Sequence, residues 1–178
     1  MPVSPIEIFL KVDGIDGEST TRGHEKETIV ASYEQGQDHP APSVGGGGAA
    51  AGRPAFPAVR FRKPVDAGSV PLIAACASGT RFRDARFTFR RAGATPLDFY
   101  RVTLEEVLVT RVVQRAGSGA QYPLSFDDLA AGAESGGLLE EVTLSFTRIH
   151  WEYQPMRTDG TLGPAVRGGW DLAANRKL

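Results

Sequence analysis

The stretch that decides the fold lies near the C-terminus, where the run Ile149-His150-Trp151-Glu152-Tyr153 is followed by a second run, Gly163-Pro164-Ala165-Val166-Arg167-Gly168-Gly169-Trp170-Asp171-Leu172. In the first run apolar side chains alternate with polar ones, which is the period of a β-strand. The connection between the runs is rich in glycine and includes Asp159-Gly160, which favours a turn. We therefore expect a β-hairpin that closes a sheet, and an architectural role for this end of the chain.

The residues before this hairpin continue the alternation but change its phase. Val142 and Leu144 place even positions inward, whereas Ile149 and Trp151 place odd positions inward. A change of phase near Arg148 requires a β-bulge or burial on both faces. A bent strand of this kind fits a closing barrel.

Most of the remaining chain also carries strand patterns. We expect strands over residues 6–12, 27–35, 59–62, 86–90, 99–104 and 106–114. One short helix is indicated by Ser69 as an N-cap, Pro71 in the first turn and Gly79 as the residue that ends it. The 178 residues fit a single domain, 1–178, that buries a proper core. The predicted fold is mainly β, a compact barrel of two sheets with one short flanking helix.

Two segments interrupt the strand patterns. Residues 36–57 are rich in Gly, Ala and Pro and contain Gly45, Gly46, Gly47 and Gly48. A segment of that composition is unsuited to a sheet interior, so we expect a long protruding loop. Residues 116–137 form a second stretch rich in Gly, Ala and Ser, which predicts a longer surface loop.

Composition excludes several classes of protein. A formal net charge of −1 argues against a general nucleic-acid binder and against a polybasic membrane-surface protein. Cys76 is the only cysteine, so no intramolecular disulfide forms and folding in the reducing cytoplasm is expected. The sequence holds neither a run of 18 apolar residues nor a Sec-type signal peptide, so we expect no membrane insertion.

Chemistry-bearing residues form no recognisable catalytic or metal site. His24, His39 and His150 lack zinc spacing, so no metal and no cofactor are expected. Cys76 lies on the apolar side of the predicted helix, which favours a buried small side chain over a nucleophile. The arginines at 81, 83, 86, 90 and 91 are either a solvated strand face or a contact surface for an acidic partner.

Sequence motifs in order along the chain resemble the haemolysin-coregulated protein family, Hcp, of bacterial type VI secretion. They are Phe9-Leu10-Lys11-Val12, Ile15-Asp16-Gly17-Glu18-Ser19, His24, the glycines at 45 to 48, Val65-Asp66, Ala75-Cys76-Ala77-Ser78-Gly79, Arg91-Ala92-Gly93, Thr103 to Val109, Trp151-Glu152-Tyr153-Gln154-Pro155 and Gly169-Trp170-Asp171-Leu172. The stretch 116–137 is longer than the family usually needs, which leaves its role in assembly open.

The resemblance implies a structural protein without enzymatic activity. Six copies would form a ring, rings would stack into a hollow tube, and the lumen would carry small effector proteins. The other implied partners are a contractile sheath and a spike protein at the tube tip, with assembly in the cytoplasm and secretion without a signal peptide. By the same resemblance Glu34 is the candidate lumen-facing residue. Gly45 to Gly48 are the candidate ring-stacking loop, because a long segment rich in Gly and Pro within a compact domain usually has a function. The alternatives are a stand-alone secreted effector or ligand-binding β-barrel, and a small hydrolase built on Cys76.

Overall fold

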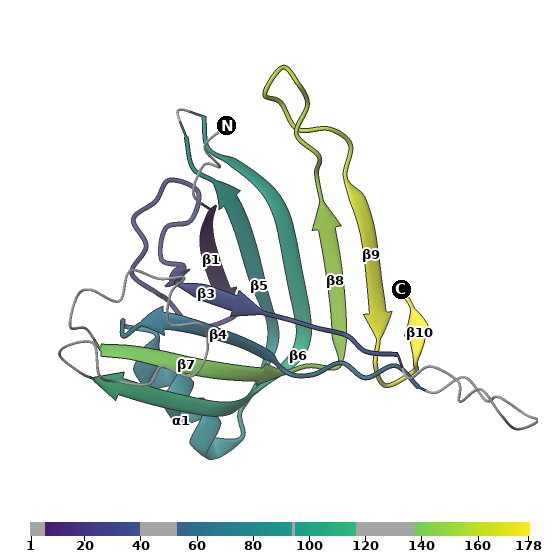
Figure 1. The fold of residues 1–178 in the computed structure, drawn as a ribbon. Helices are drawn as coiled ribbons and strands as arrows, with labels where there is room; N and C mark the ends of the chain where they lie inside the picture. The colour runs from purple at the N-terminus through teal and green to yellow at the C-terminus, as the bar shows by residue number, and fades with distance from the viewer. Residues whose placement is uncertain (1–5, 40–52, 94, 117–137) are drawn as a thin grey trace, which may run out of the picture.

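The computed structural model describes residues 6–39, 53–93, 95–116 and 138–178, and these form a mainly antiparallel β structure with one helix (Figure 1). The elements are β1 (Ile6–Val12), β2 (Thr28–Val30), β3 (Ser32–Glu34), β4 (Val59–Pro64), α1 (Ser69–Ser78), β5 (Arg81–Arg91), β6 (Leu97–Ala116), β7 (Leu138–Ser145), β8 (Arg148–Tyr153), β9 (Val166–Asp171) and β10 (Arg176–Lys177). The mainly β prediction with one short helix is confirmed.

The long strand β6 organises the sheet because it belongs to two layers. Its first part pairs with β5 and β8, and its second part pairs with β7. Between the two parts Glu106 adopts a φ of 54°, a left-handed conformation that is rare for a residue with a side chain. The strand therefore bends there, and β7 and β4 run across the direction of β1, β5 and β8 in Figure 1.

The predicted barrel of two sheets needs correction, because the described strands form one bent sheet that does not close. The main path is β10-β9-β8-β6-β5-β1-β2, and β7, β4 and β3 continue from β6 in the second layer. The strand predicted over 27–35 is broken at Ala31 into β2, which pairs with β1, and β3, which pairs with β4. The Ala31 N–H donates to the carbonyl of Arg62 at 2.8 Å and so links the two layers at this break.

The predicted C-terminal hairpin is present, but it extends the sheet instead of closing it. β8 and β9 pair antiparallel, with Ile149 opposite Trp170 and Tyr153 opposite Val166. The predicted change of phase near Arg148 is the corner between β7 and β8, where the Thr147 N–H donates to the Glu105 carbonyl at 3.0 Å. We call β8 and β9 the wing, and β1 to β7 with α1 the two-layer body.

The core lies between the layers and over the inner face of α1. Its largest fully buried apolar side chains include Phe61, Phe87, Leu72, Leu104 and Leu144. They come from β4, β5, α1, β6 and β7, so each of these elements contributes its inward positions, as the alternation of strand residues predicts.

A charged network around the buried Lys63 and Glu140 fixes α1 to the sheet. The Lys63 ammonium lies 2.7 Å from both Glu140 and Asp66, and the Lys63 and Glu140 side chains have no exposed surface. The Ser69 hydroxyl donates to Glu140 at 2.8 Å and accepts the Asp66 N–H at 3.0 Å. The predicted N-cap role of Ser69 is therefore wrong: Gly68 is the N-cap, and Ser69 is recruited into the network. Gly79 ends the helix with a φ of 67°, as predicted.

Candidate functional site

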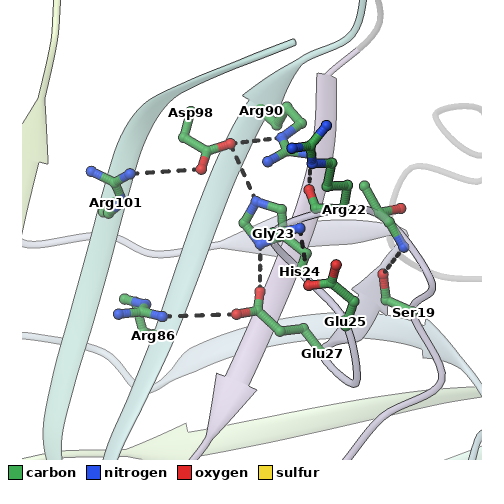
Figure 2. Close-up of polar contacts among 11 residues, drawn as sticks. Ser19, Arg22, Gly23, His24, Glu25, Glu27, Arg86, Arg90, Asp98 and Arg101 are labelled. Carbon is green, nitrogen blue, oxygen red and sulfur yellow. Dashed lines mark hydrogen bonds and ion pairs between the residues drawn. The ribbon is translucent and has the colours of Figure 1, made fainter.

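The polar face of the first layer carries a cluster built around His24 (Figure 2). His24 is 4% exposed and stacks on the ring of Phe9 with centroids 4.2 Å apart. Its Nδ1 lies 2.7 Å from Glu27, and its Nε2 lies 3.2 Å from Asp98. Because a carboxylate only accepts hydrogen bonds, a ring that carries protons on both nitrogens satisfies both neighbours. His24 therefore joins the loop between β1 and β2 to the start of β6.

The His24 cluster is the end of a longer chain of ion pairs across the sheet. Asp98 accepts from Arg90 at 2.7 Å and lies 3.6 Å from Arg101, which donates to Glu152 of β8 at 2.9 Å. Arg167 of β9 donates to the other oxygen of Glu152 at 2.6 Å. One connected set of charges therefore spans β5, β6, β8 and β9.

The two carboxylates that hold this set together have pKa values below their usual range. Burial acts to raise the pKa of Asp98, but the hydrogen bonds and charges of Arg90 and His24 outweigh it. The hydrogen bond from Arg167 lowers the pKa of Glu152, and Arg101 adds to the effect. Both groups are ionised at neutral pH, so their ion pairs with the arginines of the neighbouring strands are maintained.

A groove of about 390 Å³ lies over the middle of this face, and its lining includes Arg86, Arg101, His150, Glu152 and Arg167. Each of these charged groups already has a partner in the chain: Arg86 lies 3.7 Å from Glu27, and His150 lies 3.0 Å from Glu105. The groove is thus lined by internally neutralised charges, with the backbone of Gly168 and Gly169 at one side.

The opposite face of the wing is apolar. Phe56 stacks between Trp151 and Trp170, with ring centroids 6.5 Å and 6.2 Å away, and covers the part of the wing near the body. Farther out on the same face, Tyr153 is 45% exposed and Val166 is 65% exposed. Trp170 of the same face is partly buried, with Phe56 over one side of it.

The outward face of α1 is also apolar. Every residue of the helix is uncharged, and Val70 and Ile73 are 73% and 39% exposed, with Pro71, Ala74 and Ala77 exposed beside them. A helix that is apolar on all sides normally lies buried between other elements. Its inner residues Leu72 and Ala75 face the core, and no element among the described residues covers the outer stripe.

The sequence-predicted residues fall in different places. Glu34 ends β3 on the polar face of the second layer, where it pairs with Arg60 at 2.8 Å and its side chain is 42% exposed. Gly45 to Gly48 and residues 117–137 lie outside the described residues. The C-terminal described end of the 36–57 segment lies against the wing, since Phe56 stacks on Trp151 and Trp170. A backbone bridge joins Asp38 to Ala55, and the preceding Gln35 accepts a hydrogen bond from the Trp151 indole at 3.2 Å.

Three further predictions concern residues on α1 and β5 and metal binding. Cys76 is partly buried against the core, as a small apolar side chain would be. Of the predicted arginine patch, Arg86 and Arg90 belong to the His24 cluster, whereas Arg83 pairs with Asp84 and is 76% exposed. Within residues 6–39, 53–93, 95–116 and 138–178, no group of three or more His, Cys, Asp and Glu side chains has the arrangement of a metal site. The same residues include no helix with the length and hydrophobicity that a membrane span requires.

Sequence comparison identifies the family. Residues 9–153 match the profile described as "Type VI secretion system effector, Hcp". The chain belongs to the Hcp family of type VI secretion proteins. It is 31% identical to Protein hcp1 of Pseudomonas aeruginosa over 172 residues, which is 96% of this chain and 97% of that protein.

Solved structures agree on the fold. A crystal structure of Hcp1 from Salmonella typhimurium has 25% identity and a TM-score of 0.71, with 97% of this chain and 99% of that chain covered. A structure described as a type six secretion system protein has 22% identity and a TM-score of 0.83, covering 98% and 100% of the two chains, and supports the fold alone.

Some features of the site could not be seen in the sequence. His24 was noticed as one of three histidines and as part of the family resemblance, but nothing nearby in the sequence indicates Asp98 as its partner, 74 positions away. Lys63 and Glu140 were also missed, although a lysine at an inward position of the strand around Val59 and Phe61 is the signal that could have found this network.

Proposed function

We propose that this protein is the subunit of the type VI secretion inner tube, in which six copies form a ring and rings stack. The observation that carries the proposal is the near-complete coverage of an Hcp1 protein, 97% of its length, by a chain that belongs to the same family. A mechanical role is supported by the polar face, whose charges are paired within the chain, and by the described strands, which form one continuous bent sheet.

The remaining partners follow from the same role. A contractile sheath would surround the tube, a spike protein would sit at its tip, and small effector proteins would travel in the lumen. Assembly would take place in the cytoplasm, with export by the type VI apparatus itself. Glu34 is our candidate for the lumen wall, and Gly45 to Gly48 are our candidate for the contact between rings.

The test is the mass of the purified protein by multi-angle light scattering, combined with negative-stain electron microscopy. We expect a mass of six copies of the 19.0 kDa chain and annular particles. A monomer up to near-millimolar concentration would contradict the proposal and would favour a stand-alone secreted module.

The Glu34 assignment has its own test. Glu34→Arg would reverse one charge per copy around the lumen, in water, so the fold should tolerate it. We expect unchanged rings that recover a different set of effector proteins in co-purification. Arg60→Gln, which breaks the same ion pair while Glu34 keeps its charge, serves as the control for loss of the pair.

A further inference from the structure

Two apolar patches remain open on the described chain, and they lie far apart. The first is the α1 stripe, formed by Val70, Ile73, Ala74 and Ala77, which share one face of the helix by their spacing. The second is the wing tip, formed by Tyr153 and Val166. In Figure 1 the helix lies beneath β7 at the lower left, and the wing stands at the right.

We infer that the α1 stripe of one copy docks on the wing tip of the next copy, and that this contact closes the ring. The inference rests on the proposed ring, which it deepens by naming the two surfaces. A ring closes through a contact in which one surface of each copy meets a different surface of its neighbour. A chain with two separate, unlike apolar patches at opposite sides has the arrangement that such a contact needs.

Both patches are rigid before any partner arrives. The buried pair of Lys63 with Glu140 and the Ser69 hydroxyl hold the first turn of α1 in place. Phe56 braces Trp151 and Trp170 at the base of the wing, and Arg167 is tied to Glu152 on its other face. Preformed surfaces lose little conformational freedom on association, which favours tight contacts.

The patches also complement each other in shape and character. The helix offers a narrow convex row of small side chains, among which Val70 and Ile73 are the largest. The wing offers a sheet surface whose apolar residues continue the core-facing positions of Ile149 and Trp151. Packing a helix on that surface would repeat, between copies, what α1 already does against β6 within one copy.

The test uses one charge on each patch. Val70→Glu places an acid in the first turn of α1, where it suits the helix dipole, and Val166→Lys places a lysine on a strand that lies near the sheet edge. Both positions are exposed, so the fold should persist. Each variant alone buries an unpaired charge in every contact of the ring, and we expect its assembly constant to fall about 100-fold or more.

Mixing the two variants makes the test specific. In an alternating ring, half of the contacts pair Glu at 70 with Lys at 166, and the other half are wild type. We therefore expect an equal mixture of the two monomeric variants to recover rings, as should the double variant. Ile29→Lys, at a half-exposed site outside both patches, is the matched control and should leave rings intact.

The outcomes separate this inference from the proposed function. Wild-type protein that stays monomeric would contradict the proposed ring, and with it the proposed function. Wild-type rings that survive both single variants would leave the ring standing and overturn the assignment of the two patches. Two monomeric variants that fail to reassemble on mixing would show that the patches meet other surfaces, and would overturn their pairing with each other.

Discussion

The apolar residues of the two-layer body and of the wing differ in their exposure to solvent. In the body, Phe61, Phe87 and Leu144 are at most 1% exposed, because two layers of one chain enclose them. In the wing, the same face of the sheet continues outward until Tyr153 and Val166 are 45% and 65% exposed. One chain thus completes the core between the strands of the body, whereas our inference assigns the cover of the wing tip, and of the α1 stripe, to a neighbouring copy. On that inference, stability depends on the enclosed core, and assembly depends on the two exposed patches.

The largest expected effect lies in the body, at the buried charges. Lys63→Met would leave Glu140 and Asp66 without their cation, and we expect the free energy of unfolding to fall by about 3 to 5 kcal/mol. Lys26→Met, which removes an exposed pair with Asp16, is the control and should cost less than about 1 kcal/mol. Urea unfolding at a fixed protein concentration measures both, and equal losses would contradict the role given to the buried network.

A second prediction compares two neighbouring glycines of the wing. A Cβ at Gly169 would lie 3.0 Å from His150 Nδ1 and from the Ile149 carbonyl oxygen, whereas a Cβ at Gly168 would meet only Trp151, at 4.0 Å. Gly169→Ala should lower the free energy of unfolding by about 1 to 3 kcal/mol because backbone must shift. Gly168→Ala should change it by less than about 1 kcal/mol. Melting temperatures of the two variants side by side decide the matter, and the reverse order would count against the β8–β9 geometry.

The third prediction concerns the polar face and the pH dependence of stability. The direction of this dependence follows from the lowered pKa of Asp98. A carboxylate whose pKa is lower in the folded protein stabilises the fold at pH values above its ordinary pKa of 3.8. That contribution is lost as the pH falls through the pKa of the folded state. Asp98→Asn removes this titration, so its stability should fall less steeply with acid than that of the wild type. Urea midpoints measured from neutral pH down to about pH 2 test this, and parallel curves would rule out the assigned contribution of Asp98.

The smallest expected effect is a gain in the body. The Tyr33 hydroxyl is buried without a hydrogen-bond partner in the described part of the chain, and burial raises the pKa of Tyr33. Its ring packs against Phe87 and Phe89 at 4.7 Å and 5.1 Å, contacts that phenylalanine would keep. Tyr33→Phe should therefore raise the free energy of unfolding by about 0.5 to 1 kcal/mol. A loss of stability would reveal a partner for this hydroxyl.

Local patterns predicted most of the strands because alternation is a local property. The run from Ile6 to Val12 became β1 as expected, and the turn glycine Gly79 ended α1 with a positive φ. The bend of β6 at Glu106 and the break at Ala31 were not predicted, since each depends on which strand pairs on either side. Ser69 was misassigned for the same reason: its hydroxyl is taken by Glu140, 71 positions away.

Functional surfaces were predicted least well. The resemblance to Hcp supplied the role and the choice of Glu34, whereas the composition of residues 36–57 supplied Gly45 to Gly48. Both assignments stay predictions. The apolar helix was visible as Val70 to Ala77, yet such a run predicts burial without saying whether the cover comes from the same chain. Only the exposure of Val70 and Val166 in the folded chain distinguishes the two cases.

Hydrogen exchange compared between wild-type rings and the Val166→Lys variant tests the central claim most directly. Amide protection in the body strands β1, β4, β5 and β7 should be the same in both, because one chain encloses the core between these strands. Protection of α1 and of the outer wing around Tyr153 should be high in the rings and fall in the dissociated variant. Equal protection of α1 and the wing in both states would contradict the account, as would a loss of protection throughout the body.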